Sequence, residues 1–204
     1  MPLRRNDAYL DLVETHALCP FARPCRERGR LHRAVVPGDG AALADGIHRE
    51  LLGLAAGGAL ATVEVALLLA PEFSGGAHAF ETLAAQAHAR ANAELGKSFG
   101  FFVVAFHPDL PGSDDDAHRL VGLLRRTPDP TLQVVRASVL EALREPGVGE
   151  KIYVDPEDGA ALAAATCAPP PPSLSERIAA ANLATWHESD TLRASLAALR
   201  GRGA

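Results

Sequence analysis

A histidine follows the most strand-like segment of the chain. The run from Gly100 to Phe106 is almost continuously apolar and rich in aromatic and β-branched residues, which favours a strand covered on both faces. His107 comes next, and Pro108 cannot continue a sheet ladder, so we expect the strand to end there. A histidine at a strand end is a candidate metal ligand or general base, with Asp109 near enough in sequence to orient the imidazole. The alternative is a packed histidine whose ring is satisfied by a backbone carbonyl.

A second group of candidate residues surrounds Cys19. His16, Cys19 and Cys25 could contribute to a zinc site, but no second Cys/His pair stands at structural-zinc spacing, and Cys167 is remote. Cys19 could instead be a reactive thiol, although thiolates are favoured at helix N-termini and this cysteine follows a predicted helix. The structural alternative is that Cys19 and Phe21 are buried beside a turn.

A third group consists of arginines around a rigid segment rich in proline. Arg125 and Arg126 precede Thr127–Pro130, and Arg136 follows the next predicted strand. Guanidinium groups so placed could bind a carboxylate or a propionate. The alternative is an exposed helix C-terminus, where arginines are favoured by the helix dipole.

Composition and charge restrict the class of protein. The chain has 204 residues, 48% of them hydrophobic, which is enough for one domain with a sizeable core. Its formal net charge of -5 argues against non-specific binding to nucleic acid or to a membrane surface. The N-terminus lacks the apolar core of a signal peptide, and the most apolar run, Ala59 to Pro71, is too short to span a bilayer. We expect a cytoplasmic protein that acts on a small molecule and binds neither nucleic acid nor membrane.

The residue pattern predicts alternating strands and helices. We expect strands over 31–36, 61–70, 99–106, 132–135 and 152–154, and helices over 7–18, 41–56, 78–95, 138–144 and 155–165. A further helix, with Asp114–Asp116 at its start, should run through Leu124. This order predicts an α/β or α+β domain with a single mixed β-sheet covered by helices. Residues 1–168 would form that domain, and 169–172 a proline spacer. Residues 173–204 would form a C-terminal helix, opened by a capping box at Ser173 and Glu176, that packs on the same domain or on the partner of a homodimer.

The motifs, in their order, resemble those of an uncharacterised bacterial domain family. They are Leu18–Ala22, Phe106–Asp109, Arg126–Leu132 with Arg136, and the tail 176–185. Members of that family carry Cys-Pro-Phe-Ala, Phe-His-Pro-Asp-Tyr and Arg-Ser-Pro-x-Pro-x-Leu in this order. The resemblance covers most of residues 10–187. Leu110 stands where the family has Tyr and Thr127 where it has Ser, which puts a shared substrate in doubt more than a shared fold.

The same order of motifs is similar, more distantly, to YqcI/YcgG-type haem proteins. Some of those resemble haem-dependent enzymes that oxidise amine or guanidine nitrogen in natural-product pathways. The resemblance implies haem b with His107 as the iron ligand and His16 as the fallback. It also implies a pocket around the haem and its propionates, formed by Cys19, Phe21, Phe106, Arg125, Arg126 and Arg136.

Three functions follow as hypotheses. The first is a haem-dependent oxidoreductase of bacterial secondary metabolism that oxidises a small amine or amino acid at nitrogen, with His107 and Cys19 as catalytic residues. The second is a thiol- or metal-dependent enzyme that uses Cys19 with His16 or His107. The third is a non-catalytic haem carrier or sensor.

Overall fold

A four-stranded mixed sheet lies at the centre of the computed structural model, which describes residues 1–19, 21–96, 100–142 and 173–200. The strands are β1 (Leu31–Val35), β2 (Val65–Leu69), β3 (Phe101–Phe106) and β4 (Thr131–Arg136). They lie in the order β1-β2-β4-β3. β1 pairs parallel to β2, whereas β4 is antiparallel to both of its neighbours, so β1, β2 and β3 point in the same direction. The predicted fold class, a mixed sheet covered by helices, is confirmed as an α+β fold.

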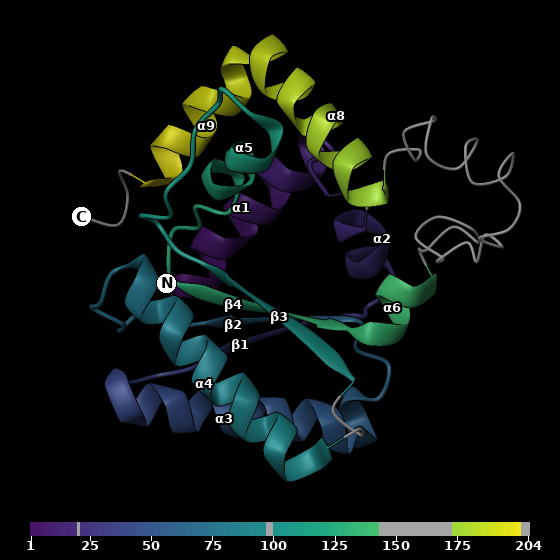
Figure 1. Cartoon of the computed structure of the whole chain (residues 1–204), viewed down its shortest axis with the longest axis vertical. Helices are drawn as coiled ribbons and strands as arrows, with labels where there is room; N and C mark the ends of the chain where they lie inside the picture. Colours follow the sequence, from purple (N-terminus) through teal and green to yellow (C-terminus); the bar gives the residue numbers. More distant parts are fainter. Residues whose placement is uncertain (20, 97–99, 143–172, 201–204) are drawn as a thin grey trace, which may run out of the picture.

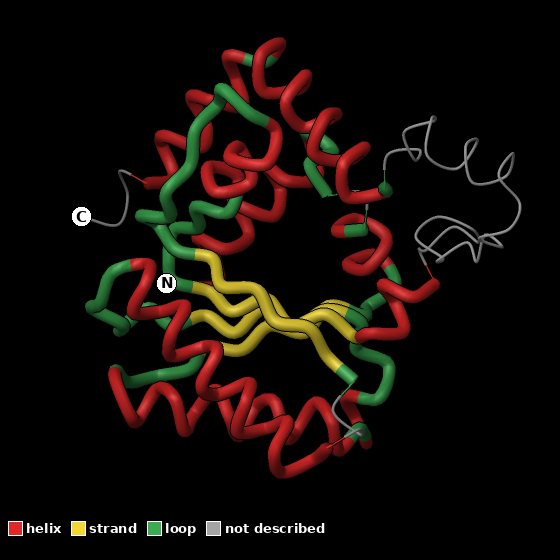
Figure 2. Tube along the Cα trace, viewed as in Figure 1, coloured by secondary structure: helices red, strands yellow, loops and turns green. Residues whose placement is uncertain are grey.

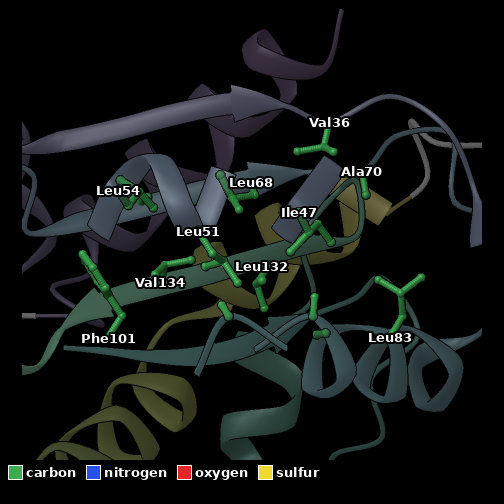
Figure 3. Packing of buried hydrophobic residues seen from close by; sticks show 14 of the residues in the cluster. Val36, Ile47, Leu51, Leu54, Leu68, Ala70, Leu83, Phe101, Leu132 and Val134 are labelled. Carbon is green, nitrogen blue, oxygen red and sulfur yellow. The ribbon is translucent and has the colours of Figure 1, made fainter. Parts of the chain in front are cut away.

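Two long helices, α3 (Gly40–Ala56) and α4 (Ala77–Leu95), cover one face of the sheet (Figure 1). Side chains alternate between the faces of a strand, so Leu68, Leu132 and Val134 point to this side, where they are fully buried. Figure 3 shows them among apolar residues of α3 such as Leu51 and Leu54. This face therefore carries a continuous apolar core.

Shorter helices from both ends of the chain and one from its middle cover the opposite face (Figure 2). They are α1 (Pro2–Thr15), α2 (Ala22–Glu27), α5 (Ala117–Leu124), α8 (Leu174–Glu188) and α9 (Asp190–Arg200). Tyr9 and Val13 of α1 belong to one apolar cluster with Leu120 of α5 and Leu192 of α9. No helix in the described ranges is long and apolar enough to cross a membrane.

The loop before α5 packs unusually close to that helix. A β-carbon built on Gly122 would lie 1.9 Å from the carbonyl oxygen of Pro111, and one on Gly112 would lie 2.6 Å from the amide nitrogen of Leu123. Asp116 caps the helix, and its carboxylate accepts hydrogen bonds from the amides of the next turn. These contacts fix α5, whose C-terminal end reaches the site described below.

Most predicted elements are present with shifted ends, and the capping box at Ser173 and Glu176 is confirmed. The expected strand over 61–70 begins only at Val65. The C-terminal helix expected within 173–204 is interrupted at Ser189, whose hydroxyl accepts a hydrogen bond from the amide of Leu192 and starts α9. Helix α2 was not predicted. The predicted helix over 138–144 is present as α6 (Ala137–Ala142) up to residue 142. Its last two residues, the strand at 152–154, the helix at 155–165 and the proline spacer lie outside the described residues.

The close approach at Gly122 gives a stability test. Gly122→Ala forces the added methyl group against the Pro111 carbonyl, and we expect it to lower the free energy of unfolding by about 2 kcal/mol or more. Gly53→Ala is the matched control, because Gly53 is exposed within α3 with no atom near its missing β-carbon. That control should raise stability by roughly 0.5–1 kcal/mol. Urea unfolding followed by circular dichroism measures both; equal stability of Gly122→Ala and wild type would contradict the packing.

Candidate functional site

His107 lies at the end of β3 and both of its ring nitrogens are engaged by the backbone. Its Nε2 hydrogen-bonds the carbonyl oxygen of Gly75 at 3.1 Å, and its Nδ1 accepts the amide of Asp109 at 3.1 Å. This arrangement requires the neutral ring with the proton on Nε2. The ring is 4% exposed and packs against the rings of Phe73 and Phe80, on the α3/α4 side of the sheet.

This environment decides what His107 can do. Burial lowers the pKa of the imidazole, and the Gly75 carbonyl opposes that shift only in part. Asp109 orients the ring as expected from its spacing, but through its backbone amide and not through its carboxylate. The strand-end position matches the sequence-based expectation, and the ring is satisfied by backbone groups.

The ring presents no free nitrogen to an iron in this conformation, so the residues around His107 do not fit an axial haem ligand as they stand. His16, the fallback, ends α1 and is not among the residues that line the cavity described next. In the part of the chain that the structure describes, no three His, Cys, Asp or Glu side chains are grouped to hold a metal ion. Binding of haem b stays a prediction.

The three predicted arginines do not form one clamp. Arg126 donates from Nε to the carbonyl oxygen of Leu110 at 2.8 Å. Arg136 donates from Nε to the carbonyl oxygen of Val63 at 2.8 Å, at the far end of β4. Arg125 alone enters the space between the sheet and the shorter helices.

That space is a cavity of about 330 Å³ on the α1/α5/α8 side of the sheet. Its wall is mainly apolar. The lining residues are Tyr9, Leu10, Val13, Leu18, Cys19, Phe21, Ala22, Cys25, Leu31, Val65, Leu67, Phe106, Val121, Leu124, Arg125, Gln133, Ser175, Ile178, Ala179 and Asn182. Among the predicted site residues, the structure thus brings together Cys19, Phe21, Phe106 and Arg125, and leaves out His107, Arg126 and Arg136. Pro20 lies outside the described residues.

Several polar groups of the cavity wall are already satisfied. The Tyr9 hydroxyl donates to the carbonyl oxygen of Leu124 at 2.6 Å, and burial raises the pKa of this phenol, which stays neutral. The side-chain amide of Asn182 donates to the carbonyl oxygen of Leu18 at 3.1 Å. These two residues tie α1 to α5 and α8 to the Cys19 turn, and so they build the wall.

Two polar side chains of the wall have no such bond. No described residue forms a hydrogen bond or an ion pair with the Arg125 guanidinium, which lies 5.8 Å from the centre of the Phe106 ring. Burial lowers the pKa of Arg125, and the Tyr9 hydroxyl acts in the opposite direction. The amide of Gln133, on the sheet face below the cavity, likewise has no hydrogen-bond partner within the described ranges. Both side chains are half-buried, so their donors stay open to the cavity, where a ligand could use them.

The two described cysteines both line the cavity as free thiols. Burial raises the pKa of Cys19, while the backbone amides that follow it oppose that shift. Burial, followed by the charge of Glu64, raises the pKa of Cys25 to about 11. Both thiols are therefore protonated at neutral pH, and none of the described residues that line the cavity is a histidine that would serve as a base. Cys167 lies outside the described residues.

Sequence reasoning missed Tyr9, Gln133 and Asn182. Gln133 carried a usable signal, because a lone amide within the apolar strand Leu132–Val135 is an unusual polar residue in a central strand. Asn182 lies in the tail motif 176–185 that carries the family resemblance, whereas Tyr9 stands in no motif; the partners of both, Leu18 and Leu124, are 164 and 115 residues away in sequence.

The buried His107 ring predicts a specific pH dependence of stability. In the unfolded chain the His107 imidazole takes up a proton near pH 6.5. In the folded protein its pKa is lowered, so protonation needs a lower pH. The stabilisation is thus complete above about pH 6.5 and is lost as the pH falls toward the lowered value. We expect His107→Gln to remove this part of the pH dependence, measured by urea unfolding between pH 5 and pH 8. The control His78→Gln, at an exposed position on α4, should keep it. A Soret band that disappears in His107→Gln would contradict this placement and support haem.

Comparison with known proteins places the chain in a family without assigning it an activity. No curated protein and no solved structure matches it. A family model described as a protein of unknown function, DUF1415, matches residues 9–156. The expectation of an uncharacterised domain family is confirmed, whereas the distant similarity to YqcI/YcgG-type haem proteins stays a prediction. Because the match spans more than half of the 204 residues, the chain belongs to the DUF1415 family.

Proposed function

We propose that this protein binds a small, mainly apolar carboxylic acid in the cavity between the sheet and helices α1, α2, α5 and α8. The observation that carries the proposal is the half-buried Arg125 guanidinium, which lines the cavity and has no anionic partner among the described residues. An arginine is the side chain best suited to a carboxylate, because its planar fork can donate two parallel hydrogen bonds.

The energetics favour an anionic ligand. Partial removal of a guanidinium from water costs free energy that an ion partner offsets, and the lowered pKa of Arg125 reflects that cost. The Phe106 ring beneath the guanidinium holds it by a cation–π contact but leaves its hydrogen-bond donors free. A bound carboxylate would use those donors, and a charge-assisted hydrogen bond contributes about 1.5–3 kcal/mol.

The other residues of the cavity wall determine the size and polarity of the part of the ligand that follows its acid group. Leucine, valine and alanine side chains dominate it, with the Gln133 amide as a second free polar group. A volume of about 330 Å³ is at the small end of the range for ligand pockets, which is roughly 300–1,000 Å³. These properties fit an aromatic or medium-chain acid with one polar substituent within reach of Gln133.

The proposal concerns binding, because the described lining residues of the cavity include no activated nucleophile. The Cys19 thiol is protonated because its burial raises the pKa, and no histidine or carboxylate is among those lining residues. Oxidation of a small amine or amino acid by a haem enzyme remains a separate prediction from the sequence, and the absorption spectrum of the purified protein tests it.

Replacement of Arg125 tests the proposal directly. We expect wild type to bind benzoate, cinnamate or decanoate more tightly than the corresponding uncharged amides, and Arg125→Gln to weaken binding of the acids by about tenfold or more. Arg119→Gln is the matched control, because Arg119 is an exposed arginine on the same helix. Titration calorimetry and thermal shift measure both. Equal binding of acids and amides, or equal binding by wild type and Arg125→Gln, would refute the proposal.

Alkylation of Cys19 distinguishes binding from thiol catalysis. The raised pKa leaves little thiolate at pH 7.5, so we expect iodoacetamide to react about tenfold or more slowly with Cys19 than with free cysteine. A bound carboxylic acid should slow the reaction further, since Cys19 lines the cavity. Peptide mass spectrometry separates Cys19 from the other two cysteines. Fast alkylation at neutral pH would favour the thiol-dependent enzyme instead.

A further inference from the structure

A second hollow adjoins the cavity. It is a groove of about 500 Å³ beside the start of β2 and the end of β4. It shares three lining residues with the cavity: Phe21 and Cys25 from the α2 region and Val65 from β2. The two hollows therefore adjoin at these three residues, whose side chains are apolar.

The groove is positively charged although the whole chain is acidic. Three arginines line it, Arg28, Arg30 and Arg136, against one carboxylate, Glu64. Glu64 forms an ion pair with Arg30. The Arg136 guanidinium donates hydrogen bonds to backbone carbonyls and lies over the Phe101 ring. Within the described ranges, no carboxylate neutralises its charge. Arg28 is exposed and has no ion pair with any described residue.

The two charged ends are separated by the length of a strand. Arg125 lies against the Phe106 ring and Arg136 against the Phe101 ring, and both rings belong to β3. Five residues along a strand span about 17 Å, and this odd spacing puts the two rings on opposite faces of the sheet, Phe106 in the cluster with α1 and α5 and Phe101 in the core under α3 and α4. A ligand that joins the ends must therefore be elongated.

We propose that the groove binds a second anionic group of the same ligand, so that the protein takes an elongated acid with a negative charge at each end and an apolar middle. The inference rests on the proposed function, which supplies the carboxylate at Arg125. The charge of the groove attracts the second group, and the apolar side chains of Phe21, Cys25 and Val65 contact the middle. The arrangement selects a two-ended acid over a one-ended acid of equal length.

Sebacate and decanoate form a matched pair for the test, because their chains are equally long and only sebacate carries a second carboxylate. We expect wild type to bind sebacate about tenfold more tightly than decanoate by titration calorimetry. Arg28→Gln should lower the affinity for sebacate at least threefold and leave decanoate unchanged, with unfolding temperature as the check on folding. Arg28 is chosen because Arg30 and Arg136 hold neighbouring groups in place. Arg119→Gln, away from both hollows, should change neither affinity.

The outcomes separate this inference from the proposed function. If Arg125→Gln weakens decanoate but sebacate binds no more tightly than decanoate, the second anionic site is refuted and the first stands. An equal effect of Arg28→Gln on both acids, or no effect on either, also refutes the second site. If neither acid binds, or Arg125→Gln leaves decanoate binding unchanged, the proposed function fails and the inference fails with it.

Discussion

The sheet has to be covered on both faces, and the two faces are covered in different ways. On one side α3 and α4 run across the strands, and the alternating side chains of β2 and β4 fill the space between them. On the other side the cover comes from shorter helices of both chain ends together with α5, which meet at angles and do not fill the space completely. The cavity lies on this second side.

The hydrogen bonds of the polar side chains then distinguish residues that stabilise the fold from residues that are available to a ligand. Both ring nitrogens of His107 form hydrogen bonds with backbone groups, and the side chains of Tyr9 and Asn182 donate hydrogen bonds to backbone carbonyls. A satisfied polar group in a core stabilises a unique arrangement and needs no ligand to explain it. Arg125 and Gln133 face the same apolar cavity without partners among the described residues, and that difference is the physical basis for assigning the site to them.

Local signals in the sequence predicted local structure. The end of β3 at His107, the cap of α5 and the capping box of α8 each depend on residues within a few positions of one another. The sequence pattern did not predict helix α2, because Pro24 lies within its first turn and proline is typical of loops. The site depends on tertiary packing instead: Arg125 and Arg126 are neighbours of the same type, yet only Arg125 faces the cavity, because Arg126 bonds the carbonyl of Leu110 in the loop that packs on α5.

The cavity is assembled from two parts of the chain that differ in their relation to the family. Tyr9, Arg125 and Gln133 lie within the residues that match the family model, whereas α8 lies beyond them. α8 is held over the cavity by Asn182, which bonds the Leu18 carbonyl, and by Trp186, which bonds the carboxylate of Asp114 before α5. The Arg125 guanidinium therefore lies within the family match, whereas the helix that closes the cavity lies outside it. A change in α8 would alter the shape of the space for the apolar body of a ligand and leave the guanidinium that binds its acid group in place.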